Sequence, residues 1–203
     1  MRSKLEDGLK QLGIIFSPEQ IQLQINYLMM LEKWNKAFNL TAITQTDEMV
    51  TLHTLDSLSV YPYLKANKVL DVGTGAGLPG IPLAIMFPEK QFTLLDSNGK
   101  KTRFLQQAKF ELKLANVEVI HTRMENYQTN HCFDGIISRA VGSIQQLFQA
   151  TQHLLCQDGQ MMLMKGVYQP QDVHDTPGKI SIKQLEVPGL DAQRHLVIVE
   201  DIE

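Results

Sequence analysis

The sequence is poor in cysteine, with Cys132 and Cys156 as the only two among 203 residues. A small secreted domain held together by disulfides needs several pairs in a much shorter chain, so this class is excluded. No run of about 18 apolar residues is present, which excludes an ordinary membrane-spanning helix. The first residues also lack the apolar stretch of a signal peptide. These absences predict a cytoplasmic protein without a membrane partner, in which both cysteines stay reduced.

The sequence also lacks a large excess of either charge. It has 19 Lys and Arg and 22 Asp and Glu, which gives a formal net charge of −3. A protein that binds polyanions over its whole surface needs a large excess of Lys and Arg, so that class is excluded. A single basic rim is not excluded, since the segment 100–123 carries six basic residues against Glu111 and Glu118. With 43% hydrophobic residues and no glycine or proline repeat, the chain is neither disordered nor collagen-like. The composition predicts a folded domain with a sizeable core.

The first part of the sequence carries patterns that are typical of helices. Leucines recur at helical spacing over residues 3–12, and Ser17-Pro18-Glu19-Gln20 is typical of the capped start of a second helix. A third helix is expected over residues 46–60, where Thr46-Asp47-Glu48 opens it. We therefore predict that residues 1–65 form an N-terminal helical cap.

From residue 66 to residue 203, short apolar runs alternate with helical stretches, which predicts one compact α/β unit. Five of the runs are predicted to be buried strands, at residues 69–72, 92–95, 117–120, 135–137 and 161–164. Helices are expected between them, at residues 79–86, 100–115 and 143–155. This alternation predicts a mostly parallel, Rossmann-like sheet covered on both faces. Residues 180–187 and 196–199 follow with no helix between them and are predicted to form an antiparallel hairpin.

A glycine-rich turn follows the first strand of this unit. The segment Val69-Leu70-Asp71-Val72-Gly73-Thr74-Gly75-Ala76-Gly77-Leu78-Pro79-Gly80 runs from a buried strand through glycines into a helix. Glycines at this place allow a tight turn and let a ligand approach the backbone at the carboxyl end of the strand. The pattern alone is ambiguous. The glycines at 75, 77 and 80 match the dinucleotide pattern G-x-G-x-x-G, whereas those at 73, 75 and 77 give G-x-G-x-G.

Asp71, the short length of chain after the turn and the terminal hairpin favour an S-adenosylmethionine site over a dinucleotide site, whereas Asp96 indicates a nucleoside of either kind. Asp71 at the strand end would repel a pyrophosphate and attract a cationic methionine group. Asp96 closes the next strand and is placed to bind the two ribose hydroxyls of an adenosine, which suits either cofactor. Only about 125 residues follow the turn, too few for the substrate domain of a dehydrogenase, and a terminal antiparallel hairpin is typical of class I methyltransferases. A nicotinamide-binding module without its own catalysis is the alternative.

A series of short motifs occurs in order from about Trp34 to Val199. These motifs are Asn39-Leu40-Thr41, His53, Asp56-Ser57, Asp71–Ile81, Leu94-Leu95-Asp96-Ser97, Gly99-Lys100-Lys101, Arg103-Phe104-Leu105, Phe133-Asp134, Ser138-Arg139-Ala140, Lys165-Gly166 and Arg194-His195-Leu196-Val197. In them the chain resembles the bacterial 16S ribosomal RNA guanine-N7 methyltransferases, also called the glucose-inhibited division protein B family. The run Leu78-Pro79-Gly80-Ile81-Pro82 makes the resemblance specific, because it is not general methyltransferase sequence.

The resemblance implies S-adenosylmethionine as the methyl donor and N7 of one guanine in 16S ribosomal RNA of the small subunit as the acceptor. It also implies cofactor contacts from the matching positions Gly73, Leu78, Met124, Glu125 and Arg139. Gly75, Asp96 and Ser97, at the same strand ends, are expected to bind the cofactor as well. The sequence departs from the family pattern in two places. The stretch 167–179 is shorter than usual, and the residues around Glu125 vary.

The acceptor chemistry sets what the remaining site residues must do. Guanine N7 already carries a lone pair in the ring plane, so its methylation needs no deprotonation and no strong general base is expected. Positioning then supplies most of the rate. Arg123, Arg139 and Lys165 stand at or just beyond strand ends, and we expect them to position the RNA, with ordinary solvated charge as the alternative. Arg194 and His195 either reach the substrate or edge the final hairpin.

Several roles stay open at this point. No metal site is predicted, because the six histidines show no HxxxH spacing and no CxxC partner. His53, Asp56 and Ser57 belong either to the cofactor pocket or to hydrogen bonds within the helical cap. The expected partner is 16S ribosomal RNA or the small ribosomal subunit, and the protein is expected to act as a monomer. A methyltransferase for a protein or a small molecule is the second alternative, which only the family resemblance excludes.

Overall fold

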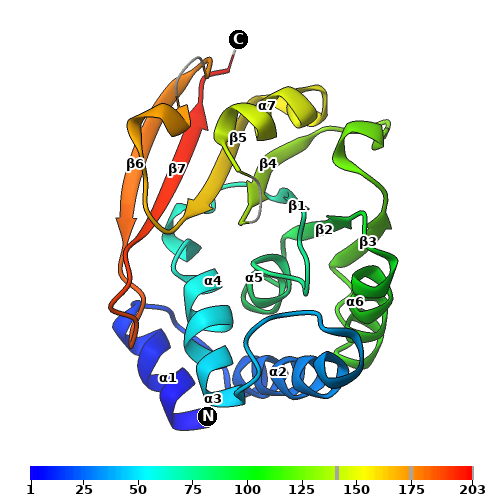
Figure 1. Cartoon of the computed structure of the whole chain (residues 1–203), viewed down its shortest axis with the longest axis vertical. Coiled ribbons are helices and arrows are strands. Elements are labelled where there is room, and N and C mark those ends of the chain that lie inside the picture. Colours follow the sequence, from blue (N-terminus) through cyan, green and yellow to red (C-terminus); the bar gives the residue numbers. More distant parts are fainter. Residues whose placement is uncertain (140–141, 174–175, 203) are drawn as a thin grey trace.

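The computed structural model describes residues 1–139, 142–173 and 176–202, in which a central seven-stranded sheet carries helices on both faces (Figure 1). Ala140 of the Ser138-Arg139-Ala140 motif lies outside the described residues. The strands are β1 (Lys68–Val72), β2 (Gln91–Asp96), β3 (Val117–His121), β4 (Phe133–Ser138), β5 (Leu155–Lys165), β6 (Lys179–Leu185) and β7 (Arg194–Glu200). A strand is present at each of the positions predicted from the sequence.

The helices surround this sheet. The α-helices are α1 (Arg2–Gln11), α2 (Pro18–Phe38), α3 (Thr46–Met49), α4 (Asp56–Leu58), α5 (Gly80–Met86), α6 (Gly99–Glu111) and α7 (Ile144–Thr151). Short 3-10 helices lie at Tyr61–Tyr63, Met124–Asn126, Gln152–Leu154 and Pro170–Val173. Within the described ranges, none of the helices combines the length and the apolar character that a membrane crossing requires.

The strand order is β3-β2-β1-β4-β5-β7-β6. The first five strands of the chain pair in parallel, and β7 runs antiparallel to both β5 and β6. The prediction of a mostly parallel sheet that ends in an antiparallel hairpin is confirmed. The order of the strands reverses between β1 and β4. In open α/β sheets, ligands bind beyond the carboxyl ends of the strands at such a point.

Two hydrophobic clusters cover the two faces of the sheet, because successive side chains of a strand point to opposite sides. On one face, Val69 and Leu94 are buried in a cluster that includes residues of α1, α2, α5 and α6. On the other face, Leu70 and Leu95 are buried in a smaller cluster with residues of α7. The helical cap and the helices that follow β1 and β2 therefore share one core.

Helix α2 fastens the N-terminal part to the sheet. Its start is the predicted capping box: Ser17 Oγ accepts from the N–H of Gln20 at 3.1 Å, and the N–H of Ser17 donates to Oε1 of Gln20 at 2.9 Å. Further along, the buried Gln24 donates from Nε2 to the carbonyl of Pro82 in α5 at 2.9 Å. The boundary at residue 65 between a cap and a second unit stays a prediction.

The helix expected over residues 46–60 is not one continuous α-helix. Its middle, Val50–Leu55, is a π-helix between α3 and α4, and the N–H of Asp56 reaches the carbonyl of Thr51 five residues back. Such turns are rare and often lie at functional sites. The segment carries His53 and places Asp56 at its end, and both residues line a pocket described below.

The prediction that both cysteines stay reduced is wrong for this structure. Cys132 and Cys156 form a disulfide, with their Cα atoms 5.0 Å apart. β5 begins at Leu155, earlier than expected, and Leu155 pairs with Phe133 of β4. This pairing brings two cysteines that are 24 residues apart in the sequence side by side at the amino end of the sheet.

Gly80, the first residue of α5, allows this helix to lie close to β1 and β2. A Cβ atom at this position would collide with Cδ2 of Leu94 and would lie 2.7 Å from Oδ2 of Asp71. Both neighbours are fully buried and have little room to shift.

We expect Gly80→Ala to lower the free energy of unfolding by about 1–3 kcal/mol, the usual cost of overpacking a core. Gly142→Ala is the matched control, because its Cβ would meet mainly the flexible end of Gln146, at 2.8 Å from Oε1. Urea unfolding of both variants measures the difference. Equal losses of stability in the two variants would contradict the packing argument.

Candidate active site

Two pockets lie at the carboxyl ends of the central strands. The first, of about 350 Å³, lies beyond β1, β2 and β3. The second, of about 390 Å³, lies between the π-helical segment, the ends of β4 and β5, and the start of β7. Both volumes are in the usual range for small-molecule sites. The pockets lie on either side of the point where the strand order reverses.

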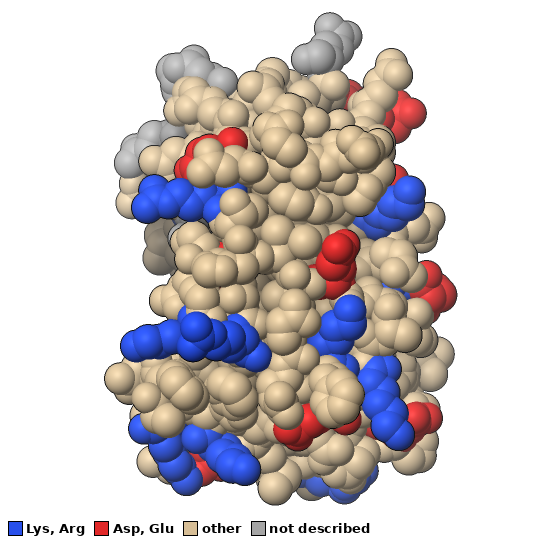
Figure 2. All heavy atoms as spheres, turned by 90° about the vertical axis from the view of Figure 1, so that its right-hand side faces the viewer, with Lys and Arg blue, Asp and Glu red and all other residues tan. Residues whose placement is uncertain are grey.

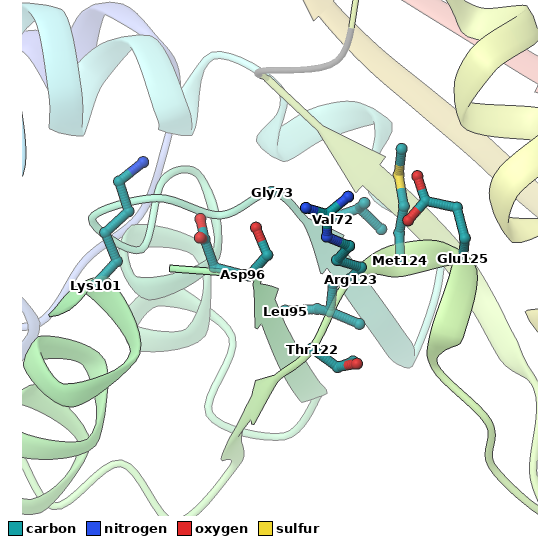
Figure 3. Close-up of a pocket in the computed structure, with 10 residues that line it drawn as sticks. Val72, Gly73, Leu95, Asp96, Lys101, Thr122, Arg123, Met124 and Glu125 are labelled. Atoms are coloured by element: carbon teal, nitrogen blue, oxygen red, sulfur yellow. The ribbon is translucent and has the colours of Figure 1, made fainter. Parts of the chain in front are cut away.

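The first pocket contains most of the residues predicted to hold the cofactor (Figure 3). Its walls are formed by Val72, Gly73, Leu95, Asp96, Ser97, Lys101, Thr122, Arg123, Met124 and Glu125. Arg123, which was expected to position the RNA, lines this pocket, and its role toward the RNA stays a prediction. Lys101 and Thr122 were not expected here, because only the sheet order shows that the start of α6 and the end of β3 meet at this pocket.

The glycine turn after β1 adopts backbone conformations that favour glycine. Gly73, Gly75 and Gly77 have φ values of 66°, 64° and 98°. The N–H of Gly75 donates to Oδ2 of Asp96 at 2.8 Å, and the N–H of Asn98 donates to Oδ1 of the same carboxylate at 2.8 Å. The turn and Asp96 therefore hold one another in place at the pocket wall.

Two residues of the turn that were predicted to contact the cofactor are not among those that line the pocket. Leu78 is buried in the core, and Gly75 is engaged with Asp96. The far side of the turn is held by the helical cap, because Tyr27 of α2 donates its hydroxyl to the carbonyl of Ala76 at 2.7 Å. Burial raises the pKa of Tyr27, so the phenol stays a neutral donor.

Asp71 is a fully buried carboxylate at the end of β1. Its Oδ2 accepts from Oγ1 of Thr74 at 2.7 Å and from the N–H of Gly80 at 2.8 Å. Its Oδ1 has no hydrogen-bond partner among the described residues. Burial raises the pKa of Asp71 to about 7, although the two hydrogen bonds act in the opposite direction.

The place of this carboxylate bears on the choice between the two cofactors. In dinucleotide-binding folds, the pyrophosphate lies against the first N–H groups of the helix after the glycine turn. Here the N–H of Gly80, at the start of α5, is already bonded to Asp71. A buried carboxylate with one unpaired oxygen favours a cationic ligand and disfavours a phosphate. The arrangement fits S-adenosylmethionine better than a nicotinamide dinucleotide.

The second pocket brings together residues from three parts of the chain. Its walls are formed by Ile43, Leu52, His53, Asp56, Arg139, Met164, Lys165, Gly166, Leu185, Arg194 and His195. Arg139 and Lys165, both expected to position the RNA, meet here. Arg139 was also expected at the cofactor, but it is not among the residues that line the first pocket.

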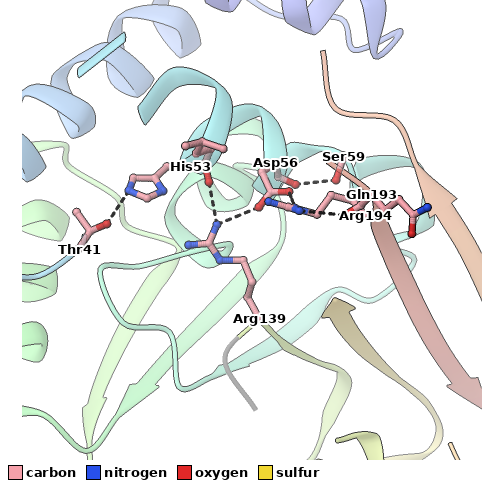
Figure 4. Close-up of polar contacts among 8 residues, drawn as sticks. Thr41, His53, Asp56, Ser59, Arg139, Gln193 and Arg194 are labelled. Atoms are coloured by element: carbon pink, nitrogen blue, oxygen red, sulfur yellow. Dashed lines mark hydrogen bonds and ion pairs between the residues drawn. The ribbon is translucent and has the colours of Figure 1, made fainter. Parts of the chain in front are cut away.

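A buried carboxylate joins two arginines in this pocket (Figure 4). Oδ2 of Asp56 accepts from Nη1 of Arg139 at 3.2 Å, and Oδ1 accepts from Nε of Arg194 at 2.9 Å. Nη1 of Arg139 also donates to the carbonyl of Leu52 at 3.2 Å. The side chain of Asp56 is 4% exposed, whereas those of Arg139 and Arg194 are 27% and 23% exposed. The carboxylate is therefore internal, and the two cations reach the surface of the pocket.

His53 lies beside this group. Its Nε2 is hydrogen-bonded with Oγ1 of Thr41 at 3.0 Å. Burial and the nearby charge of Arg139 lower the pKa of His53 to about 4. The ring is therefore neutral at physiological pH, and it adds a polar group but no charge to the pocket.

Charges elsewhere on the molecule are mixed. On the face that presents α6 and β3, Lys and Arg side chains are spread out with Asp and Glu among them (Figure 2). In residues 1–139, 142–173 and 176–202, no three His, Cys, Asp or Glu residues are grouped so that they could hold a metal ion.

Comparison with known proteins identifies the family. A family model described as rRNA small subunit methyltransferase G matches residues 20–197. The chain belongs to this family. Two relatives named ribosomal RNA small subunit methyltransferase G, from Coxiella burnetii (strain RSA 493 / Nine Mile phase I) and Ectopseudomonas mendocina (strain ymp), are 48% and 51% identical to it. The matches cover 99% and 97% of this chain and 98% and 94% of the relatives.

Solved structures show the same fold at much lower identity. A SAM dependent methyltransferase from Aquifex aeolicus is 16% identical and matches 76% of this chain and 93% of its own, with a TM-score of 0.58. An O-methyltransferase from Bacillus cereus, solved in complex with SAH, is 16% identical and matches 86% of this chain and 90% of its own, with a TM-score of 0.59. The predicted Rossmann-like class I methyltransferase fold is therefore confirmed.

We expect Asp71→Asn to affect stability and ligand binding in opposite directions. The pKa of Asp71 is raised from 3.8 to about 7 in the folded state, so its contribution to stability is fully present below pH 3.8 and is lost as the pH rises through about 7. The variant lacks this titration. Its stability relative to the wild type should therefore be higher at pH 8 than at pH 5, while its affinity for S-adenosylmethionine at pH 8 falls.

Urea unfolding at the two pH values and calorimetric titration with S-adenosylmethionine measure these effects. A variant that becomes less stable at pH 8 relative to pH 5, or that binds S-adenosylmethionine as tightly as the wild type, would contradict this account of Asp71.

Proposed function

We propose that the protein transfers the methyl group of S-adenosylmethionine to N7 of a guanine in the 16S ribosomal RNA of the small subunit. The observation that carries the proposal is the buried Asp71 carboxylate with its unpaired oxygen, beside a glycine turn in a chain of the rRNA small subunit methyltransferase G family. The two relatives carry the RNA class in their names. The guanine N7 and the 16S molecule rest on the sequence motifs that resemble the guanine-N7 family.

The residues of the first pocket fit the cofactor. Asp96 is fixed by two backbone N–H groups, so its carboxylate would accept from the ribose hydroxyls. Leu95 and Met124 offer apolar surface for the adenine ring, and Asp71 places a negative charge behind the glycine turn. The cofactor, when bound, supplies a methyl group on a positively charged sulfur.

Guanine suits an active site that positions its substrate without deprotonating it. The lone pair of N7 lies in the ring plane and needs no base, so the chain must hold the base in line with the methyl–sulfur bond. Arg139 and Lys165 in the second pocket would bind the RNA and orient this base. Arg139 follows β4, the strand beside β1, and so lies next to the glycine turn.

The two alternatives differ from the proposal in testable ways. A nicotinamide-binding module needs a free helix N-terminus after the glycine turn, and Asp71 occupies it. A methyltransferase for a protein or a small molecule would use the same first pocket and differ only in its acceptor. Action as a monomer, a cytoplasmic location and the absence of a membrane partner stay predictions from the sequence.

Methylation of small ribosomal subunits tests the proposal directly. The purified protein, S-adenosylmethionine and subunits from a strain that lacks this methyltransferase should give 7-methylguanine at one position of 16S RNA, mapped by chemical cleavage and primer extension. Asp96→Ala, which removes a cofactor contact, is the negative control. Binding of S-adenosylmethionine without 7-methylguanine in the RNA would point to another acceptor, and binding of NAD alone would exclude a methyltransferase.

Arg139→Ala and Arg123→Ala are expected to separate the two pockets. Arg139 lines the second pocket, so its loss should lower methyl transfer by about 100-fold or more through misplacement of the acceptor, with little change in S-adenosylmethionine affinity. Arg123 lines the first pocket, so its loss should weaken S-adenosylmethionine binding. Calorimetry and single-turnover methylation measure the two effects. Full turnover of Arg139→Ala on ribosomal subunits would refute its role.

A further inference from the structure

The second pocket carries a surplus of positive charge. Among the described residues, Arg139 and Arg194 line it against the carboxylate of Asp56, which gives two positive charges minus one negative charge, or one. Lys165 also lines the pocket and donates from Nζ to the carbonyl of Gly142 at 2.8 Å. The neutral His53 does not change this sum. A surplus of this kind in a pocket of about 390 Å³ favours an anionic ligand of the size of a nucleotide.

The pocket lies one strand away from the glycine turn. Ile137 of β4 pairs with Asp71 of β1, and Oγ of Ser138 donates to the carbonyl of Val72 at 2.8 Å. Arg139 follows directly, so the pocket begins where the turn begins. Two larger hollows, of about 500 and 540 Å³, lie at the amino ends of the strands, on the opposite edge of the sheet. The second pocket therefore differs from these hollows by its position beside the glycine turn, and not by a larger volume.

The hydrogen bonds of the two arginines leave part of each guanidinium available. In the described part of the chain, Arg139 uses Nη1, while Arg194 uses Nε and, toward the carbonyl of Gln193, Nη1. Nη2 of each side chain stays available for a phosphate or a base oxygen. Long arginine side chains lose much rotamer freedom when they are ordered, and Asp56 orders both before any ligand binds.

We propose that the second pocket binds the acceptor nucleotide of the RNA, and that Asp56 is a positioning residue that holds Arg139 and Arg194 in the orientation required for this binding. The inference rests on the proposed function. Asp56 acts through the two arginines, because its own oxygens are engaged with them and its side chain is almost fully buried. Its negative charge also offsets the repulsion between the arginines and the positive charge that a purine gains when N7 is methylated.

Asp56→Asn tests this role, because the amide keeps the shape of the side chain and removes its charge. We expect the KM for ribosomal subunits and the dissociation constant for 16S RNA without cofactor each to rise about tenfold or more, the scale seen when an interfacial charge pair loses one partner. The affinity for S-adenosylmethionine should stay within about twofold, since Asp56 does not line the first pocket. Asp47→Asn is the matched control. It removes another carboxylate of the N-terminal region that pairs with a cation, Lys4 at 2.9 Å, away from both pockets.

A double-mutant cycle with Arg194→Gln distinguishes positioning from a general structural role. If Asp56 acts through Arg194, the double variant should lose clearly less RNA affinity than the product of the two single losses. The proposal would be overturned if the loss of RNA affinity in the double variant equalled the product of the losses in the two single variants. It would also be overturned if Asp56→Asn bound RNA as tightly as the wild type. If Asp56→Asn does not fold, the Arg194→Gln variant alone tests the proposal. It should show the same loss of RNA affinity, with an unchanged affinity for S-adenosylmethionine.

The same experiment separates this inference from the proposed function. If the wild type places 7-methylguanine in 16S RNA and Asp56→Asn behaves as the wild type, the proposed function stands and this inference fails. If the wild type binds S-adenosylmethionine but neither binds nor methylates 16S RNA, both fail together.

Discussion

The buried carboxylate of Asp71 is the constraint on which the active site depends. It joins the end of β1 to the glycine turn through Thr74 and to the start of α5 through the N–H of Gly80. Burial of a carboxylate is unfavourable unless hydrogen bonds compensate it, and here one oxygen is compensated and the other is not. The fold thus keeps beside the turn a carboxyl group whose charged form is only partly stabilised, by Thr74, Gly80 and the charge of Arg139, while burial raises its pKa to about 7. The charged form weakens the free protein and strengthens the binding of a cation.

The helical cap contributes to both pockets. Tyr27 of α2 holds the carbonyl of Ala76 in the glycine turn, so the cofactor side of the site is supported by a helix about 50 residues earlier in the chain. The π-helical segment and α4 supply His53 and Asp56 to the second pocket. These contacts and the shared hydrophobic core join the cap to the sheet, so the cap is part of the structure that forms the two pockets.

The features that could be predicted from the sequence are those that local chemistry determines. The strands follow from short apolar runs, the capping box from Ser17 and Gln20, and the glycine turn from residues adjacent in the chain. The features that were missed depend on sheet order. Asp56 meets Arg139 and Arg194 across 83 and 138 residues of sequence, and the disulfide needs the register of β4 with β5. The π-helix, too, gives no signal in a leucine-rich helical pattern. Arg123 lies at the edge of the sheet that the sequence predicts, but spacing along the chain does not show which of the two pockets it lines.

The two buried carboxylates, Asp71 and Asp56, would stabilise charge on opposite sides of the proposed reaction. Transfer to guanine N7 moves one positive charge from the donor side of the site to the acceptor side. In the proposed reaction, Asp71 would stabilise a cation on the donor side, and Asp56 would reduce the repulsion that Arg139 and Arg194 exert on a purine cation on the acceptor side. Because binding of one structured RNA site needs positive charge only at that site, the chain needs no excess of Lys and Arg overall. A net charge of −3 is therefore compatible with an enzyme that binds one structured RNA site, because the charge that matters for this binding is local.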